Sequence, residues 1–228
     1  MSSIKIIAVN SSPKKEKGNT VKILNSFLEG AKEAGAETHL EHIYGQEINP
    51  CSACYSCWFQ TPGECAQKDD MKKIFDKFKE SDILVFCTPL YFYGVSGVMK
   101  NFIDRLLPGG TPFVEIKDDY VRKSTRGSIK MPKMVVVSSC GLPGLNQFDA
   151  MVNYFENLEK YTGMEFSGAL LRPNFRGASM HSEIFSASKK AGTQLVEEGT
   201  ISSKVLDKIS TPFTTNEEYV ETTNKIKV

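Results

Sequence analysis

Five short apolar runs alternate along the chain with longer segments whose apolar residues recur at helical spacing. The runs predict strands at 4–9, 37–43, 83–87, 134–138 and 166–171, of which 37–43 alternates polar and apolar residues as an edge strand does. The helical spacing predicts helices over 20–35, 71–78, 95–106, 148–163, 184–198 and 201–209. Strands and helices in strict alternation predict an α/β fold with a doubly wound, five-stranded parallel sheet flanked by helices.

Three of the predicted strands are followed by loops of different chemistry. Loop 11–20 is rich in hydroxyls, contains a glycine and leads into a helix, where Asn19 or Thr20 could cap the first turn. Backbone amides and hydroxyls at a helix amino terminus favour an anion, although an ordinary polar turn uses the same residue types. Loop 88–94 is aromatic, and loop 139–144 is made of small residues.

Loops at the carboxyl ends of parallel strands meet at one edge of the sheet, where ligands bind. One loop suits a phosphate, one suits a flat ring and one is small enough to let the ring approach. Flavin mononucleotide (FMN) is a ligand of this shape. The first loop matches neither the glycine pattern of dinucleotide-binding folds nor that of nucleoside-triphosphate loops.

Four cysteines lie close together in a turn-rich segment, residues 50–66. Two residues separate Cys51 from Cys54 and Cys54 from Cys57, and seven separate Cys57 from Cys65. Tight two-residue spacings favour an iron–sulfur cluster. A zinc site, a redox disulfide and plain buried thiols remain alternatives. His39 and His42 on the edge strand indicate an exposed surface rather than a metal site, and Cys140 lacks a neighbouring base that would make it a nucleophile.

Composition narrows the class of protein. A chain of 228 residues with 40% hydrophobic and 24% charged residues predicts one soluble domain, here residues 1–210, with an excursion at 107–132 and a polar tail at 211–228. A net charge of +1 with no basic stripe argues against nucleic acid as a partner. No apolar run reaches the length of a membrane span, and the first residues lack a signal-peptide cleavage region. We therefore expect a cytoplasmic protein with reduced thiols and no membrane partner.

Three motifs occur in order within residues 4–170. They are Ser11-Ser12-Pro13-Lys14 with Gly18-Asn19-Thr20, the cysteine segment ending in Asp69-Asp70-Met71, and Thr88-Pro89-Leu90-Tyr91-Phe92 with Lys100-x-Phe102-Ile103-Asp104-Arg105. Together they resemble the NAD(P)H-dependent FMN reductases of flavodoxin-like fold, and within them the iron–sulfur flavoprotein branch. The gap before Cys65 is longer than is usual in that branch.

This resemblance implies a set of cofactor-binding residues. The phosphate loop would comprise Ser11, Ser12, Pro13, Lys14, Asn19 and Thr20. The ring and ribityl chain would be held by Pro89, Leu90, Tyr91, Phe92, Tyr93 and Gly94, and the ring flanked by Ser139, Cys140 and Gly141. A [4Fe–4S] cluster would be ligated by Cys51, Cys54, Cys57 and Cys65.

The resemblance also implies a function, namely an FMN-dependent oxidoreductase or electron-transfer flavoprotein that carries a cluster. The cofactors would perform the redox chemistry, with NAD(P)H or reduced ferredoxin as electron donor and no catalytic side chain. The resemblance further implies a homodimer or homotetramer. The alternatives are a cluster-free NAD(P)H-dependent FMN or quinone reductase and a non-enzymatic flavodoxin-like electron carrier. The near-neutral charge speaks against a carrier that docks through acidic groups.

Overall fold

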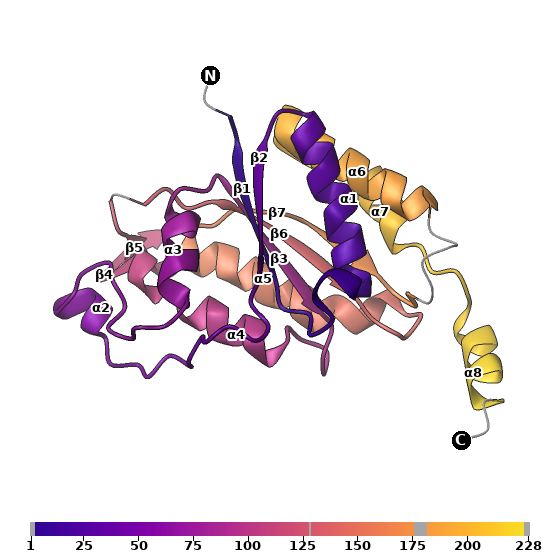
Figure 1. Cartoon of the computed structure of the whole chain (residues 1–228), viewed down its shortest axis with the longest axis horizontal. Coiled ribbons are helices and arrows are strands. Elements are labelled where there is room, and N and C mark those ends of the chain that lie inside the picture. The colour runs from indigo at the N-terminus through magenta and orange to yellow at the C-terminus, as the bar shows by residue number, and fades with distance from the viewer. Residues whose placement is uncertain (1–2, 128, 176–181, 226–228) are drawn as a thin grey trace.

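A five-stranded parallel sheet forms the centre of the protein (Figure 1). The computed structural model describes residues 3–127, 129–175 and 182–225. The strands are β1 (Lys5–Asn10), β2 (Glu37–His42), β3 (Ile83–Pro89), β6 (Lys133–Ser139) and β7 (Phe166–Arg172). Their order is β2-β1-β3-β6-β7, and every neighbouring pair is parallel. The predicted α/β doubly wound sheet is confirmed, with β2 at one edge.

Helices cover both faces of the sheet. One layer consists of α1 (Asn19–Glu33), α6 (Ser182–Glu197) and α7 (Ser203–Ser210), and the other of α3 (Met71–Lys79), α4 (Gly97–Asp104) and α5 (Asp149–Thr162). Successive side chains of a strand point to opposite faces. Accordingly, Ile6 and Ala8 belong to the core beneath the first layer, whereas Ile7 and Val9 belong to the core beneath the second. Apolar residues on both faces explain why the central strands read as continuous apolar runs.

Two local expectations are wrong in detail. Asn19 and Thr20 already lie within α1 and do not cap it; the N-cap is Gly18, which has no side chain to donate or accept a hydrogen bond. Strand β3 continues through Pro89 and does not end at Cys87. Beyond Cys87 the strand has passed the end of β1 and pairs only with β6, so the missing N–H of proline costs no hydrogen bond on the open side.

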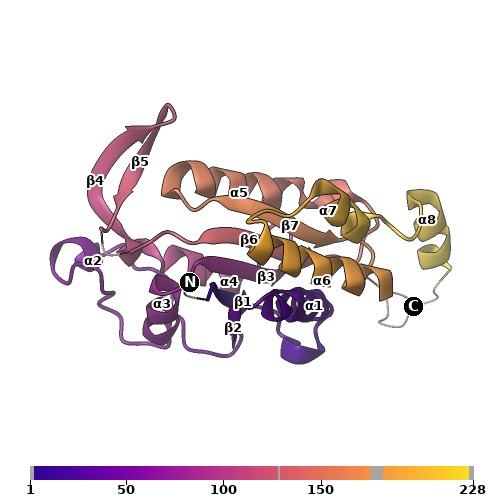
Figure 2. The same ribbon diagram turned by 90° about the horizontal axis from the view of Figure 1, so that it is seen from above.

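The excursion at 107–132 contains regular structure that the sequence analysis did not predict. A 3-10 turn (Leu107–Gly109) leads into β4 (Gly110–Lys117), which pairs antiparallel with β5 (Tyr120–Thr125). The turn residues Asp118 and Asp119 have φ values of 52° and 64°, as a two-residue hairpin requires. Figure 2 shows this β4–β5 hairpin rising at one end of the molecule beside α5, with which β5 is in contact.

The remaining elements lie outside the two helical layers. They are 3-10 turns at Lys15–Lys17 and Leu145–Phe148, the short α2 (Ser56–Phe59) inside the cysteine segment, and α8 (Asn216–Asn224) in the tail. Thr215 and Glu218 form a capping box at the start of α8, a helix with no buried residue. None of the helices in the described ranges has the length and apolar character that crossing a bilayer requires.

Glycines allow α1 and α6 to pack closely, and a substitution there should be costly. A Cβ at Gly192 would lie 1.9 Å from the carbonyl oxygen of Phe27, whereas a Cβ at Gly97 in α4 would meet nothing within 4 Å. We expect Gly192→Ala to lower the free energy of unfolding by about 3 kcal/mol, because one helix must move. Gly97→Ala should be neutral or stabilising by up to about 1 kcal/mol. Urea denaturation of both variants checks this, and equal midpoints would contradict it.

Candidate functional site

Hydrogen bonds join the three loops at the carboxyl edge of the sheet. The Ser96 hydroxyl donates to Ser11 Oγ at 2.8 Å and, through its backbone amide, Ser96 donates to Thr88 Oγ1 at 3.0 Å. The Thr20 and Ser139 hydroxyl oxygens are 2.7 Å apart. The first loop is therefore tied to the second through Ser96 and to the third through Thr20. The sequence analysis predicted that the loops meet but did not identify Ser96.

The first loop surrounds an uncapped helix amino terminus. Ser11, Ser12 and Thr20 are buried, whereas Pro13, Lys14 and Asn19 are exposed. The Ser12 hydroxyl accepts a hydrogen bond from the Lys14 amide at 3.3 Å, which curls the loop. Because Gly18 offers no side-chain acceptor, the first-turn amides of α1 face the loop without a cap. The positive end of the helix dipole and a nearby lysine suit an anion.

The second loop holds aromatic rings at the surface in a tight turn. Tyr91 and Gly94 exchange two backbone hydrogen bonds of 3.1 Å, and Phe92 and Tyr93 between them have φ values of 46° and 63°. This left-handed backbone is uncommon for aromatic residues. The Phe92 side chain is fully exposed, and Tyr91 and Tyr93 are about half exposed. A large apolar ring held outward in this way indicates a binding surface.

The second and third loops together form one pocket. Its volume is about 290 Å³, and it is lined by Leu90, Phe92, Tyr93, Cys140, Gly141, Leu142 and Gln147. Burial raises the pKa of the Cys140 thiol, whose sulfur donates to the carbonyl of Leu142 at 3.2 Å. A neutral, hydrogen-bonded thiol is a poor nucleophile, which agrees with the interpretation of Cys140 as a small loop residue.

Buried polar atoms lie unpaired beneath the third loop. Ser138 Oγ, Asn174 Oδ1, and Nε and one terminal nitrogen of Arg172 have no hydrogen-bond partner within the described part of the chain. Arg172 ends β7 and accepts a hydrogen bond from the Cys140 amide through its own carbonyl. Burial lowers the pKa of Arg172 to about 10, so its guanidinium remains charged at neutral pH. The carboxyl edge of β6 and β7 is therefore polar and cationic, which the sequence pattern did not reveal.

The four cysteines of residues 50–66 line a single pocket. Cys57 is buried in α2, Cys54 is exposed, and Cys51 and Cys65 are intermediate. All four thiols are free. Within the ranges that the structure describes, no three His, Cys, Asp or Glu side chains are arranged as a metal site. The predicted ligands thus share one pocket without forming a coordination sphere.

The thiols of this pocket influence one another electrostatically. Burial raises the pKa of Cys57, and negative charge on Cys65, Cys51 and Cys54 raises it further. Hydrogen bonds from the side chain and backbone of Ser56 and from Ser52 lower the pKa of Cys54 to about 7. Four thiolates would repel one another here, so a bound cation would be needed to deprotonate the whole set.

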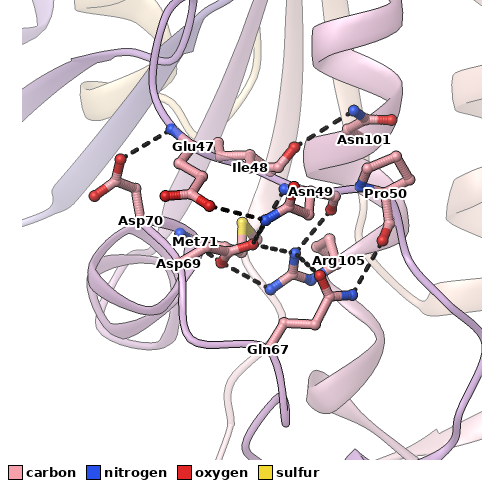
Figure 3. A network of polar contacts seen from close by, with 10 residues as sticks. All are labelled: Glu47, Ile48, Asn49, Pro50, Gln67, Asp69, Asp70, Met71, Asn101 and Arg105. Carbon is pink, nitrogen blue, oxygen red and sulfur yellow. Dashed lines mark hydrogen bonds and ion pairs between the residues drawn. The ribbon is translucent and has the colours of Figure 1, made fainter.

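A buried ion pair closes the base of the cysteine segment (Figure 3). The Arg105 guanidinium donates to both carboxylate oxygens of Asp69, at 2.6 and 2.9 Å, and both side chains are 1% exposed. Arg105 also donates to the carbonyl of Asn49 at 2.8 Å, and the Asn49 amide donates to Asp69 at 3.1 Å. On the outer side Gln67 donates to the carbonyl of Pro50 at 3.0 Å. The two ends of the segment are therefore held together by the last turn of α4.

The loss of stability at acidic pH should depend on Asp69. Burial alone would raise the pKa of Asp69, but hydrogen bonds from Arg105 and the Asn49 amide, with the charge of Arg105, lower it. The pKa of Asp69 is about 3.9 in the unfolded chain and lower in the folded protein. The ionised carboxylate therefore stabilises the fold fully above a pH of about 3.9, and this stabilisation is lost as the pH falls through the folded-state pKa. We expect the Asp69→Asn variant to be less stable than the wild type at pH 7. Between pH 5 and pH 2, however, its free energy of unfolding should fall by less than that of the wild type. Thermal melts across this range check the expectation, and parallel curves would contradict it.

The two strand histidines pair with nearby polar groups. His39 Nε2 lies 3.0 Å from Glu41 and 2.6 Å from Lys77 Nζ. His42 lies 2.9 Å from the side-chain amide of Asn10 and 3.2 Å from Glu16. These contacts fit the interpretation of the edge strand as an ordinary polar surface.

Comparisons with known proteins agree with the observed fold. An iron-sulfur flavoprotein of Archaeoglobus fulgidus is 40% identical over 102 residues, which cover 45% of this chain and 48% of the relative. Iron-sulfur flavoprotein MJ1083 of Methanocaldococcus jannaschii is 36% identical over 105 residues, covering 46% and 53%. The chain matches about half the length of these curated relatives. The solved structure of the NAD(P)H:quinone oxidoreductase from Methanothermobacter marburgensis aligns with a TM-score of 0.62 at 19% identity, covering 85% of this chain and 96% of that one.

The strand order, with three loops of ligand-binding chemistry at the carboxyl edge of the sheet, defines a flavodoxin-like fold. Residues 4–127 match the model of the NADPH-dependent FMN reductase family. The chain belongs to this family.

Proposed function

We propose that this protein is an FMN-dependent oxidoreductase that takes electrons from NAD(P)H or reduced ferredoxin. The observation that carries the proposal is the hydrogen-bonded junction of three loops in a chain that belongs to an FMN reductase family. Bound FMN would supply the redox chemistry, because flavins exchange electrons in steps of one or two.

The residues present fit FMN. The uncapped amino terminus of α1, with Ser11, Ser12, Lys14, Asn19 and Thr20, would bind the phosphate. The pocket of about 290 Å³ between Phe92 and Cys140 would take one end of the ring. Arg172, which donates to the carbonyls of Ile209 and Thr211 through one nitrogen and keeps two nitrogens unpaired, makes the carboxyl end of β7 positively charged. The chain would thus orient the cofactor and leave the outer face of the ring open beside Phe92.

The cysteine segment fits a [4Fe–4S] cluster in the chemistry of its donors. Four free thiols line one pocket, and their mutual repulsion would be relieved by iron. Cys51, Cys54, Cys57 and Cys65 would hold the cluster, whose chemistry is one-electron transfer. The Arg105–Asp69 pair would hold the two ends of the segment in place.

A second candidate is a cluster-free FMN reductase with structural cysteines. It is favoured by the lack of a preformed metal site among the described residues. The two candidates share the FMN site and differ only in the role of residues 50–66.

Anaerobic purification followed by flavin, iron and acid-labile sulfide assays tests both candidates. We expect one FMN per chain, bleached by NADH, NADPH or reduced ferredoxin, and about four iron and four sulfide per chain. Flavin without iron or sulfide would establish the cluster-free reductase. Absence of flavin, or flavin that none of these donors reduces, would overturn the proposal.

A further inference from the structure

A second cavity lies at the opposite edge of the sheet from the three loops. Its volume is about 280 Å³, and its walls come from the ends of α3 and α4, the second half of α5, strand β5 and Trp58 of α2. The ends of α3 and α5 lead into the amino ends of β3 and β7, and α4 leads through the β4–β5 hairpin to the amino end of β6, whereas the three loops follow carboxyl ends. Figure 2 shows α5 and the β4–β5 hairpin side by side, and both contribute residues to the cavity wall. It is therefore separate from the proposed flavin site.

The wall of this cavity is mainly apolar and aromatic. Four rings line it, with aliphatic side chains between them: Trp58, Phe78, Tyr154 and Tyr161. Lys123 stands at the wall with its ammonium 4.8 Å from the centre of the Trp58 ring. Small-molecule sites typically combine such a lining with a few polar groups.

One polar group in this cavity lacks a partner. The Tyr154 hydroxyl makes no hydrogen bond to any residue within the described ranges, although the side chain is partly buried. Burial, and secondly the negative charge of Asp104, raise the pKa of Tyr154 to about 12. The hydroxyl therefore keeps its proton at physiological pH and is a free donor toward a ligand oxygen. The hydroxyl is not one of the fully buried unpaired atoms of the described residues, so it is open to the cavity, where a ligand oxygen can replace water as its acceptor.

We propose that this cavity binds a planar aromatic carbonyl compound of two or three fused rings, with the Tyr154 hydroxyl donating to the carbonyl. Flat rings match the aromatic wall, because stacked or edge-to-face contacts add to the burial of apolar area. A carbonyl satisfies the unpaired donor, and Lys123 and Asp104 place one charge of each sign in the cavity wall. Because several elements of one chain all supply wall residues, the site has the concave form of a ligand pocket more than that of a flat protein-docking face. The proposal does not depend on FMN or on a cluster.

Isothermal titration calorimetry with 9,10-anthraquinone-2-sulfonate on the full-length protein, as purified with its cofactors, tests this proposal. We expect Tyr154→Phe to weaken binding about 10-fold, since it removes only the hydroxyl. Ser124→Phe, which places a ring in the cavity wall, should abolish the heat. Tyr44→Phe is the matched control, because Tyr44 is 43% exposed and lies outside the cavity. Melting temperatures confirm that each variant is folded.

Several outcomes would overturn the proposal. Absence of binding heat to the wild type would do so, as would equal affinity in the Tyr154→Phe and Tyr44→Phe variants. Binding that persists in Ser124→Phe but disappears in Phe92→Ala would place the compound in the flavin pocket instead. Sedimentation velocity tests whether a second copy of the chain fills the cavity instead of a small molecule. A wild-type dimer that the Ser124→Phe substitution dissociates would show that it does.

Discussion

Replacing Cys57 with serine is expected to reduce the iron and acid-labile sulfide of the purified protein from about four of each per chain to nearly none. Cys57 is the most deeply buried of the four thiols, with 6% exposure, and it lies in α2 at the centre of the segment. Its carbonyl accepts hydrogen bonds from the Gly63 amide at 2.9 Å and from Arg126 at 3.5 Å, so the backbone at this position is fixed. A serine hydroxyl is harder and far less acidic than a thiol, so it is a poor ligand for the cluster, and the other three cysteines are one short of the four ligands required.

The matched control is Cys140→Ser, which removes a partly buried thiol from a different loop. Iron and sulfide should remain at the wild-type level in this variant, and FMN content should be unchanged in Cys57→Ser. Equal loss of iron in both variants would show that the metal is not held by residues 50–66. Wild-type protein without iron would assign the segment to structural thiols.

Arg105→Met should lower the free energy of unfolding by about 3 to 5 kcal/mol, the usual cost of leaving one member of a buried ion pair alone. Asp69 would remain buried with a charge and without its two guanidinium hydrogen bonds. The carbonyl of Asn49 would lose its donor as well. We also expect lower iron content, because the ends of the cysteine segment would separate. Urea denaturation and iron analysis of the same preparation measure both effects.

Two variants make this prediction specific. Arg105→Met combined with Asp69→Leu should recover part of the lost stability, since neither charge is then buried alone. Lys100→Ala, which breaks an exposed pair with Asp104 in the same helix, should cost less than about 1 kcal/mol. If Lys100→Ala were as destabilising as Arg105→Met, general damage to α4 and not the ion pair would be the cause.

The sheet and its loops could be predicted because one pattern determines them. Apolar runs such as Leu84–Phe86 are buried on both faces, and parallel strands bring their carboxyl ends to one edge. The positions of Ser11, Phe92 and Ser139 follow from strand ends alone. The link through Ser96 could not be predicted, because a serine before a helix normally signals a cap, and this one also caps α4.

Other features depend on contacts between distant parts of the sequence. Arg105 appeared in a family motif, but its partners Asp69 and Asn49 lie 36 and 56 residues away, which spacing rules do not reach. The β4–β5 hairpin was missed because Pro112 and the charged residues around the turn hide its alternation. The turn dipeptide Asp118-Asp119 lacks the glycine that usually signals such a hairpin.

The position of Arg105 also sets an order of events during biosynthesis. Chains are synthesised amino terminus first, so all four cysteines of residues 50–66 are made before α4. Until Arg105 arrives, Asp69 and Asn49 have no cation to bring them together. A nascent chain that lacks residue 105 should therefore leave the two ends of the cysteine segment apart, and a chain that has released Arg105 should bring them together.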